Sequence, residues 1–236
     1  MLKRFKKRLI IVLAVCAVAG FGYVRRAVVL TSADPQNGKT VIIDPGHGGF
    51  DGGAGAEDGT LEKEINLEIS LKLRDFLRLY GYNVIMTRTT DTGTEDNSAL
   101  NISSRKKSDL RNRLRLMSGD ADTVYVSIHL NKFTTSAARG AQVFYTPNFE
   151  KARILGECIQ SSTVSLLQPD NHRVAKRGTD STYLLKNATV PAVIVECGFL
   201  SNPDDLSMLK DDSYQKSMAF CIADGIAEYY LCQIKT

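Results

Sequence analysis

The sequence lacks several patterns that define common classes of protein. It has five cysteines but no Cys-x-x-Cys pair and no regular spacing among them, which argues against a disulfide framework. It has no Gly-x-Ser-x-Gly nucleophile elbow. The GKT triplet at residues 38–40 precedes a predicted strand and lacks the first glycine of a phosphate-binding loop. No internal repeat is present, so a repeat architecture is excluded as well.

Basic charge is also scarce outside the amino terminus. The formal net charge of the 236 residues is +4, but residues 1–26 contain seven Lys or Arg and no acid. Residues 27–236 contain 23 basic and 26 acidic side chains, a net charge of −3. A nucleic-acid interface needs clustered positive charge on the folded part of the chain, so we expect no nucleic-acid partner.

The amino terminus is typical of a segment that addresses a protein to a membrane. Residues 9–24 form an apolar run of 16 residues behind a basic stretch. This run is longer than the roughly 7–15 residues of a secretory signal and shorter than the roughly 20 of a membrane-spanning helix. We predict that residues 1–26 are an export signal or an uncleaved membrane anchor, residues 27–38 a linker, and residues 39–236 an exported catalytic domain. A buried core helix is the alternative for the apolar run.

Export would place the remaining thiols outside the cytoplasm. Each of them is flanked by apolar residues, which predicts small buried side chains at Cys158, Cys197, Cys221 and Cys232. A bridge that involves Cys158 stays open at this point.

Segments with the pattern of strands alternate with segments of helical spacing along the exported part. Strands are predicted at residues 41–43, 84–86, 124–128, 141–145 and 192–195, and helices at residues 61–80, 109–117, 152–167 and 214–230, with a polar loop at 89–104. This alternation predicts one α/β domain whose parallel or mixed sheet is covered by helices on both faces.

Three of the predicted strands are followed, directly or within four residues, by a side chain that can bind metal or move a proton. These side chains are His47, His129 and Glu196. Ligands of open α/β sheets bind outside the carboxyl ends of the strands, so parallel strands would bring all three together. The chain has three histidines in all, and the third, His172, lies in a polar stretch and is expected at the surface.

A hydrolytic zinc site needs three protein ligands and an open position for water, so two histidines require a third ligand. Glu62 fits best, because it follows the glycine-rich loop and begins the predicted helix, with Thr60 as the expected cap. Glu64 points about 200° away around that helix, while Asp44 and Asp51 stay open as alternatives. Glu196 is predicted to be the general base, with a structural ion pair as the alternative.

Four motifs in this order resemble the zinc-dependent N-acetylmuramoyl-L-alanine amidases, which cut bacterial peptidoglycan. They are DPGHGG at residues 44–49, EK followed by NL at 62–67, SIHxN at 127–131 and VExGFLSNP at 195–203. The layout is most similar to that of the family's sporulation members, with NHRVAK at 171–176 and YLLK at 183–186.

This resemblance implies a mixed sheet of about six strands flanked by helices. It implies one Zn²⁺ per chain held by His47, Glu62 and His129, with Glu196 as the catalytic carboxylate, and it leaves the substrate-binding residues unassigned. The substrate would be the amide between N-acetylmuramic acid and L-Ala in the cell envelope. For a sporulation member, this would be peptidoglycan in the forespore intermembrane space, and the product would feed formation of muramic-δ-lactam in the spore cortex.

Two other functions stay open on the sequence alone. One is a membrane-tethered peptidoglycan-binding protein that keeps the fold without turnover. The other is a different zinc hydrolase, such as a carbohydrate deacetylase. The sequence does not say whether an accessory protein is needed.

Overall fold

A computed structural model describes residues 38–119, 122–179 and 182–233 of the chain. The predicted export segment 1–26 and nearly all of the predicted linker 27–38 lie outside these residues. Within the described ranges, no helix has both the length and the apolar character needed to cross a membrane.

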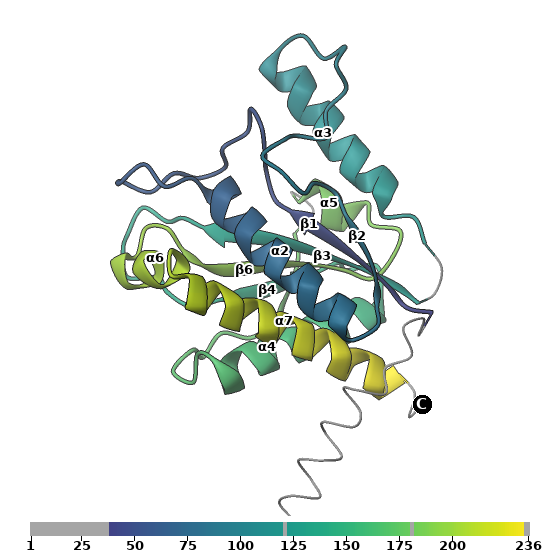
Figure 1. Ribbon diagram of the computed structural model, residues 1–236, viewed down its shortest axis with the longest axis vertical. Helices are drawn as coiled ribbons and strands as arrows, with labels where there is room; N and C mark the ends of the chain where they lie inside the picture. The colour runs from purple at the N-terminus through teal and green to yellow at the C-terminus, as the bar shows by residue number, and fades with distance from the viewer. Residues whose placement is uncertain (1–37, 120–121, 180–181, 234–236) are drawn as a thin grey trace, which may run out of the picture.

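One six-stranded sheet organises the described residues (Figure 1). Its spatial order is β2 (Asn83–Met86), β1 (Thr40–Pro45), β3 (Thr123–Asn131), β6 (Ala192–Phe199), β4 (Gln142–Tyr145) and β5 (Lys176–Arg177). The first four strands run parallel, whereas β4 is antiparallel to β6 and parallel to β5. The predicted single α/β domain with a mixed sheet of about six strands is therefore confirmed.

Three long helices cover one face of the sheet: α2 (Glu62–Leu79), α4 (Glu150–Leu166) and α7 (Asp212–Gln233). Figure 1 shows them side by side in front of the strands, where α7 packs against both α2 and α4. Alternate strand residues such as Val41, Val126 and Val195 point into this larger core. Their complete burial in an apolar layer is the main source of the stability of the domain.

A smaller core lies on the opposite face of the sheet. Ile42, Tyr125 and Ala192 point into it, one position along each strand from the residues that face the larger core. The helix α3 (Ile102–Leu116) contributes Leu110 and Leu114, and the short helix α5 (Tyr183–Lys186) contributes two buried leucines. The sheet is thus covered on both faces, as the alternating pattern predicted. The core beneath α3 and α5 is smaller than the core beneath the three long helices.

The structure differs from the sequence prediction at the short and exposed elements. Helix α3 begins at Ile102, whereas the predicted helix begins at residue 109, because Asn101 and Ser104 form a reciprocal capping box. Its first two turns are exposed and have no apolar stripe, so periodicity does not reveal them. The strand β5 and the helices α5 and α6 (Pro203–Leu209) are short and were not predicted.

The cysteines follow the prediction in part. All four cysteines of the described residues are free, and Cys197 and Cys221 are buried. Cys158 is half-buried, while Cys232 near the end of α7 is exposed, so the expectation of four buried thiols is wrong for Cys232. Cys232 lies beside Cys158 of α4, but it is close to the carboxyl end of α7, where its thiol is open to solvent.

Candidate metal centre

The first predicted ligand, His47, lies two residues beyond the end of β1. Its φ angle is 62°, in the left-handed region that few residues other than glycine adopt. The following loop returns on itself through paired hydrogen bonds between Gly48 and Asp51. This turn directs the imidazole back over the carboxyl ends of the parallel strands.

Glu62 is the first residue of α2 and is only 3 % exposed. The expected cap at Thr60 is wrong, because Leu61 is the cap residue and no side chain caps the helix. Instead, the first N–H groups of the helix donate to carbonyl oxygens of the glycine-rich loop. The N–H of Glu62 donates to the oxygen of Ala54 at 2.9 Å, and the N–H of Lys63 donates to the oxygen of Gly52 at 3.2 Å. The loop therefore sets the position of the carboxylate.

The Glu62 carboxylate lies between the two predicted imidazoles. Its Oε2 is 3.2 Å from His47 Nε2, and its Oε1 is 2.9 Å from His129 Nδ1. Backbone N–H groups of Ala54 and Leu130 donate to the two carboxylate oxygens at 2.8 and 3.1 Å. Burial acts to raise the pKa of Glu62, but hydrogen bonds to the two histidines outweigh it and hold that pKa well below its usual range.

One ligand atom from each of His47, Glu62 and His129 lies within 4.8 Å of the other two. The imidazole ring centroids are 4.9 Å apart at an angle of 76°, and each histidine side chain is about one-fifth exposed. Two imidazoles and one carboxylate in this arrangement suit zinc, with solvent reaching a fourth position. The structure thus brings the three residues together, and it places Glu64 on the exposed side of α2.

Close packing around the imidazoles depends on two glycines. A Cβ atom on Gly46 would lie 2.3 Å from the His129 ring. A Cβ atom on Gly53, which has a φ of 71°, would lie 2.6 Å from Glu62 Oε2 and 2.7 Å from the His47 ring. The glycines of the loop are therefore needed for space as well as for backbone conformation.

Glu196 is paired in register with His129 on the neighbouring parallel strand. Its Oε2 is buried and has no hydrogen-bond partner among the described residues. Burial raises the pKa of Glu196 to about 7, although the nearby histidines act to lower it. No basic side chain forms an ion pair with it in the described parts of the chain, which argues against a purely structural carboxylate.

The two open alternatives from the sequence have other partners. Asp51 Oδ2 lies 3.0 Å from His47 Nδ1, the ring nitrogen that faces away from Glu62. Burial acts to lower the pKa of His47, but hydrogen bonds to Asp51 and Glu62 raise it to about 9. Asp44 is buried on the sheet and contacts Ser127 and Arg113 rather than either histidine. Asp51 therefore supports a ligand, and Asp44 belongs to the framework behind the site.

Two buried arginines that sequence analysis did not single out hold the loop that carries His47. Arg88 donates to the backbone oxygens of Pro45 and Gly46 at 2.9 and 3.0 Å. Arg113 donates to the oxygens of Pro45 and His47 at 3.0 and 2.6 Å, and it pairs with Asp109 through Nε. Arg113 is spaced four residues from Asp109 on α3, and this was the one local signal that could have marked it.

The sequence matches a known family over most of its length. A family model described as N-acetylmuramoyl-L-alanine amidase matches residues 41–228. The germination-specific N-acetylmuramoyl-L-alanine amidase of Bacillus subtilis strain 168 is 38 % identical over 196 residues, which cover 83 % of this chain and 81 % of that protein.

Solved structures show the same similarity. The CwlD amidase of Clostridioides difficile, solved in complex with the GerS lipoprotein, is 39 % identical with a TM-score of 0.79. The match covers 82 % of this chain and 99 % of that one. The catalytic domain of CwlV from Bacillus (Paenibacillus) polymyxa var. colistinus is 30 % identical, with a TM-score of 0.64 over 81 % of this chain and 98 % of that one.

Proposed function

This chain belongs to the N-acetylmuramoyl-L-alanine amidase family, and we propose that it hydrolyses the amide between N-acetylmuramic acid and L-Ala as a zinc enzyme. The observation that carries the proposal is the meeting of His47, Glu62 and His129 beside the partnerless carboxylate oxygen of Glu196. Two nitrogen donors and one oxygen donor match the ligand number and chemistry of catalytic zinc sites, and solvent reaches the partly exposed imidazoles.

The protein side chains divide the work of the reaction. Bound zinc would supply a Lewis acid for the amide carbonyl and make water a better nucleophile. Glu196, with a pKa near neutrality, accepts a proton from the attacking water and delivers it to the departing nitrogen of L-Ala. Breakage of the C–N bond leaves a carboxylate on the lactyl group and a free amine on the peptide. Asp51 fixes the ring of His47 through Nδ1.

The biological setting that we propose is sporulation or germination. Support comes from the similarity to the germination-specific amidase and to CwlD. We infer that the substrate is peptidoglycan of the spore cortex, and that the product feeds formation of muramic-δ-lactam. The basic and apolar residues 1–26 support export across a membrane and attachment to it. The CwlD structure contains a lipoprotein, which makes an accessory partner a testable part of this proposal.

The decisive experiment is digestion of purified peptidoglycan by the full chain loaded with zinc. Amidase activity should expose new L-Ala amino termini and leave the glycan strands intact. New reducing ends would indicate a glycosidase, and released acetate would indicate a deacetylase. Zinc content, measured on the same samples, should be one per chain and should fall sharply in His129→Ala. Glu196→Gln should retain zinc and lose turnover. The control Glu64→Gln, at an exposed position, should change neither the zinc content nor the turnover.

A further inference from the structure

Arg173 is held in a fixed position, and in the described parts of the chain its side chain makes no ion pair. Its Nε donates to the backbone oxygen of Arg139 at 2.9 Å, and its Nη1 donates to Gln142 Oε1 at 3.0 Å. The guanidinium carbon lies 4.8 Å from the centre of the Phe199 ring. None of the ion pairs formed by the described residues includes Arg173. The charge of Arg173 acts to lower the pKa of Asp205, but the hydrogen bonds to that carboxylate come from the backbone N–H groups of Gly140 and Phe199.

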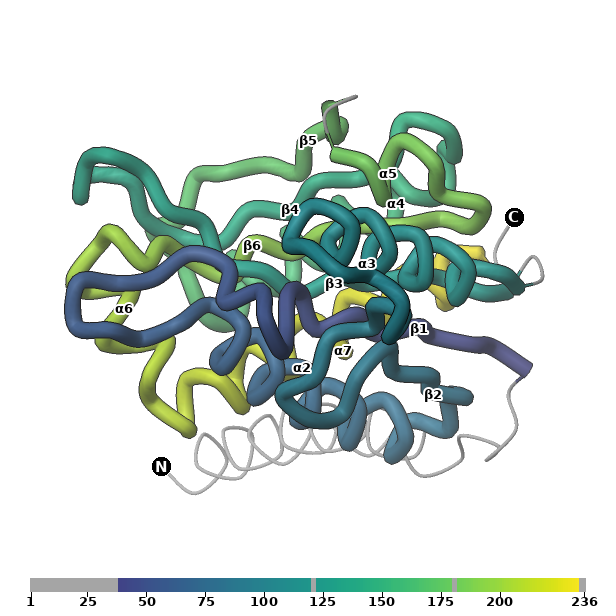
Figure 2. Tube along the Cα trace, turned by 90° about the horizontal axis from the view of Figure 1, so that it is seen from above, coloured from purple at the N-terminus to yellow at the C-terminus, as the bar shows by residue number. Residues whose placement is uncertain are grey.

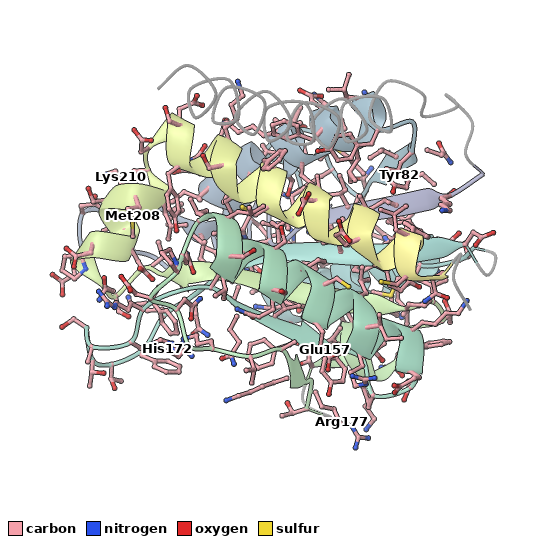
Figure 3. All side chains as sticks on the ribbon, turned by 90° about the horizontal axis from the view of Figure 1, so that it is seen from below. Tyr82, Glu157, His172, Arg177, Met208 and Lys210 are labelled. Carbon is pink, nitrogen blue, oxygen red and sulfur yellow. The ribbon has the colours of Figure 1, made fainter. Side chains whose placement is uncertain are left out.

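This arginine lies next to the strand position of the proposed general base. Gln142 on β4 is directly opposite Glu196 on β6, so the two side chains project from the same face of the sheet. Gln142 also donates to the backbone oxygen of Val174 at 3.0 Å, which holds the segment carrying Arg173 against β4. That segment follows the edge of the sheet beside α4, between the labelled His172 and Arg177 (Figure 3).

The opposite side of the site is bordered by α3, which covers the smaller core of the sheet and lies near the viewer in the middle of Figure 2. Its Lys106 is already paired with Asp51, at 3.4 Å, and its Arg105 with Glu95. Arg173 differs from these side chains because its hydrogen bonds go to a carbonyl and an amide. A guanidinium that neutral groups hold in place is prepared to bind a carboxylate with little further loss of side-chain freedom.

We propose that Arg173 is a specificity-determining residue that binds a carboxylate on the peptide side of the substrate. The inference rests on the proposed amidase function. The N-acetylated glycan is neutral, whereas the peptide beyond L-Ala carries free carboxylates. The guanidinium is bound to Gln142, whose partner across the strands is Glu196. We therefore place the carboxylate on the residue that follows L-Ala.

A double-mutant cycle between enzyme and substrate tests this assignment. Two synthetic substrates, N-acetylmuramoyl-L-Ala-D-Glu with a free α-carboxylate and the same compound with an α-carboxamide, both with the γ-carboxyl group blocked as an amide, are compared on the full chain and on Arg173→Gln. We expect the substitution to lower kcat/KM for the carboxylate substrate by about 10- to 100-fold, mainly through KM. Turnover of the carboxamide should change less than about twofold, and Arg173→Lys should recover part of the loss.

The matched control is Arg177→Gln, which removes the same charge from an exposed position four residues away. It should not discriminate between the two substrates. An equal loss on both substrates in Arg173→Gln would make Arg173 a purely structural residue and overturn the proposal. So would a wild-type enzyme that hydrolyses both substrates equally well.

Failure of the proposed function can be told apart from failure of this inference. If the zinc-loaded, folded chain hydrolyses neither substrate, the amidase proposal fails in these conditions, and calorimetric binding of the same two compounds then decides the role of Arg173. Tighter binding of the carboxylate by about tenfold, lost in Arg173→Gln, would support it. Equal binding of the two compounds would overturn it.

Discussion

The guanidinium of Arg113 donates a 2.6 Å hydrogen bond to the backbone oxygen of His47, the proposed ligand whose φ is 62°. A left-handed conformation at a non-glycine residue costs on the order of 1–3 kcal/mol and persists only where the surroundings fix it. Arg113, which is 2 % exposed, supplies that restraint, and its own charge is balanced by Asp44 and Asp109. Helix α3 is thereby connected to the geometry of the metal centre.

The first prediction concerns this connection. Arg113→Gln should lower the free energy of unfolding by about 3–5 kcal/mol, because it leaves buried carboxylates without their partner. It should also weaken zinc binding in the protein that still folds, since His47 loses its restraint. Arg111→Gln, at an exposed position on the same helix, is the control for charge. Chemical denaturation and a zinc competition titration measure the two effects, and unchanged zinc affinity would separate Arg113 from the site.

Much of this site follows from a simple property of parallel strands. His129 and Glu196 come directly after apolar runs and His47 comes four residues after one, and strands that run in one direction present their carboxyl ends together. Glu62 is favoured over Glu64 because it begins the helix after the glycine-rich loop while Glu64 points about 200° away, and the family resemblance implies the same choice. The supporting residues could not be predicted in this way, because buried arginines such as Arg113 act on backbone oxygens far away in the chain. Such contacts exist only after the elements have packed.

The second prediction concerns Asp51, whose carboxylate holds Nδ1 of His47. Asp51→Asn should lower zinc affinity by about 10- to 100-fold, which is the usual effect of removing a partner behind a metal ligand. Asp58→Asn provides the control, since Asp58 is on the same loop but pairs with Lys210 at the surface. A competition titration gives both affinities. A loss far beyond a hundredfold would mean that Asp51 itself binds the metal.

The third prediction is a dependence of stability on acid. Burial acts to raise the pKa of Asp44, but Arg113 and the hydroxyl groups of Ser127 and Thr87 hold that pKa well below its usual range. Because the folded pKa is below the unfolded value of about 3.9, the carboxylate stabilises the fold above that value. The contribution is lost as the pH falls through about 4 and below.

Asp44→Asn should therefore be less stable than the wild type at pH 7 and lose less stability on acidification. Denaturation by urea between pH 7 and pH 3, with zinc removed from every sample, checks this slope. Asp75→Asn, at an exposed position of α2, is the control. Parallel pH curves for the wild type and Asp44→Asn would contradict the prediction.

The fourth prediction uses the space around His129. A methyl group at Gly46 would lie 2.3 Å from the imidazole, so Gly46→Ala must displace the ring or the loop. We expect a folded protein with most of its zinc affinity and turnover lost, because a ligand displaced by even 1 Å no longer fits the coordination distances of about 2.0–2.2 Å. Gly55→Ala is the matched control, since its added methyl group would meet only Leu61 at 3.7 Å. Circular dichroism verifies the fold, and zinc content separates the two variants.

Equal zinc content in the two variants would contradict this prediction. It would show that His129 is dispensable as a ligand or that the loop adjusts without cost. The close approach of Gly46 to the imidazole would then have no role in the metal centre.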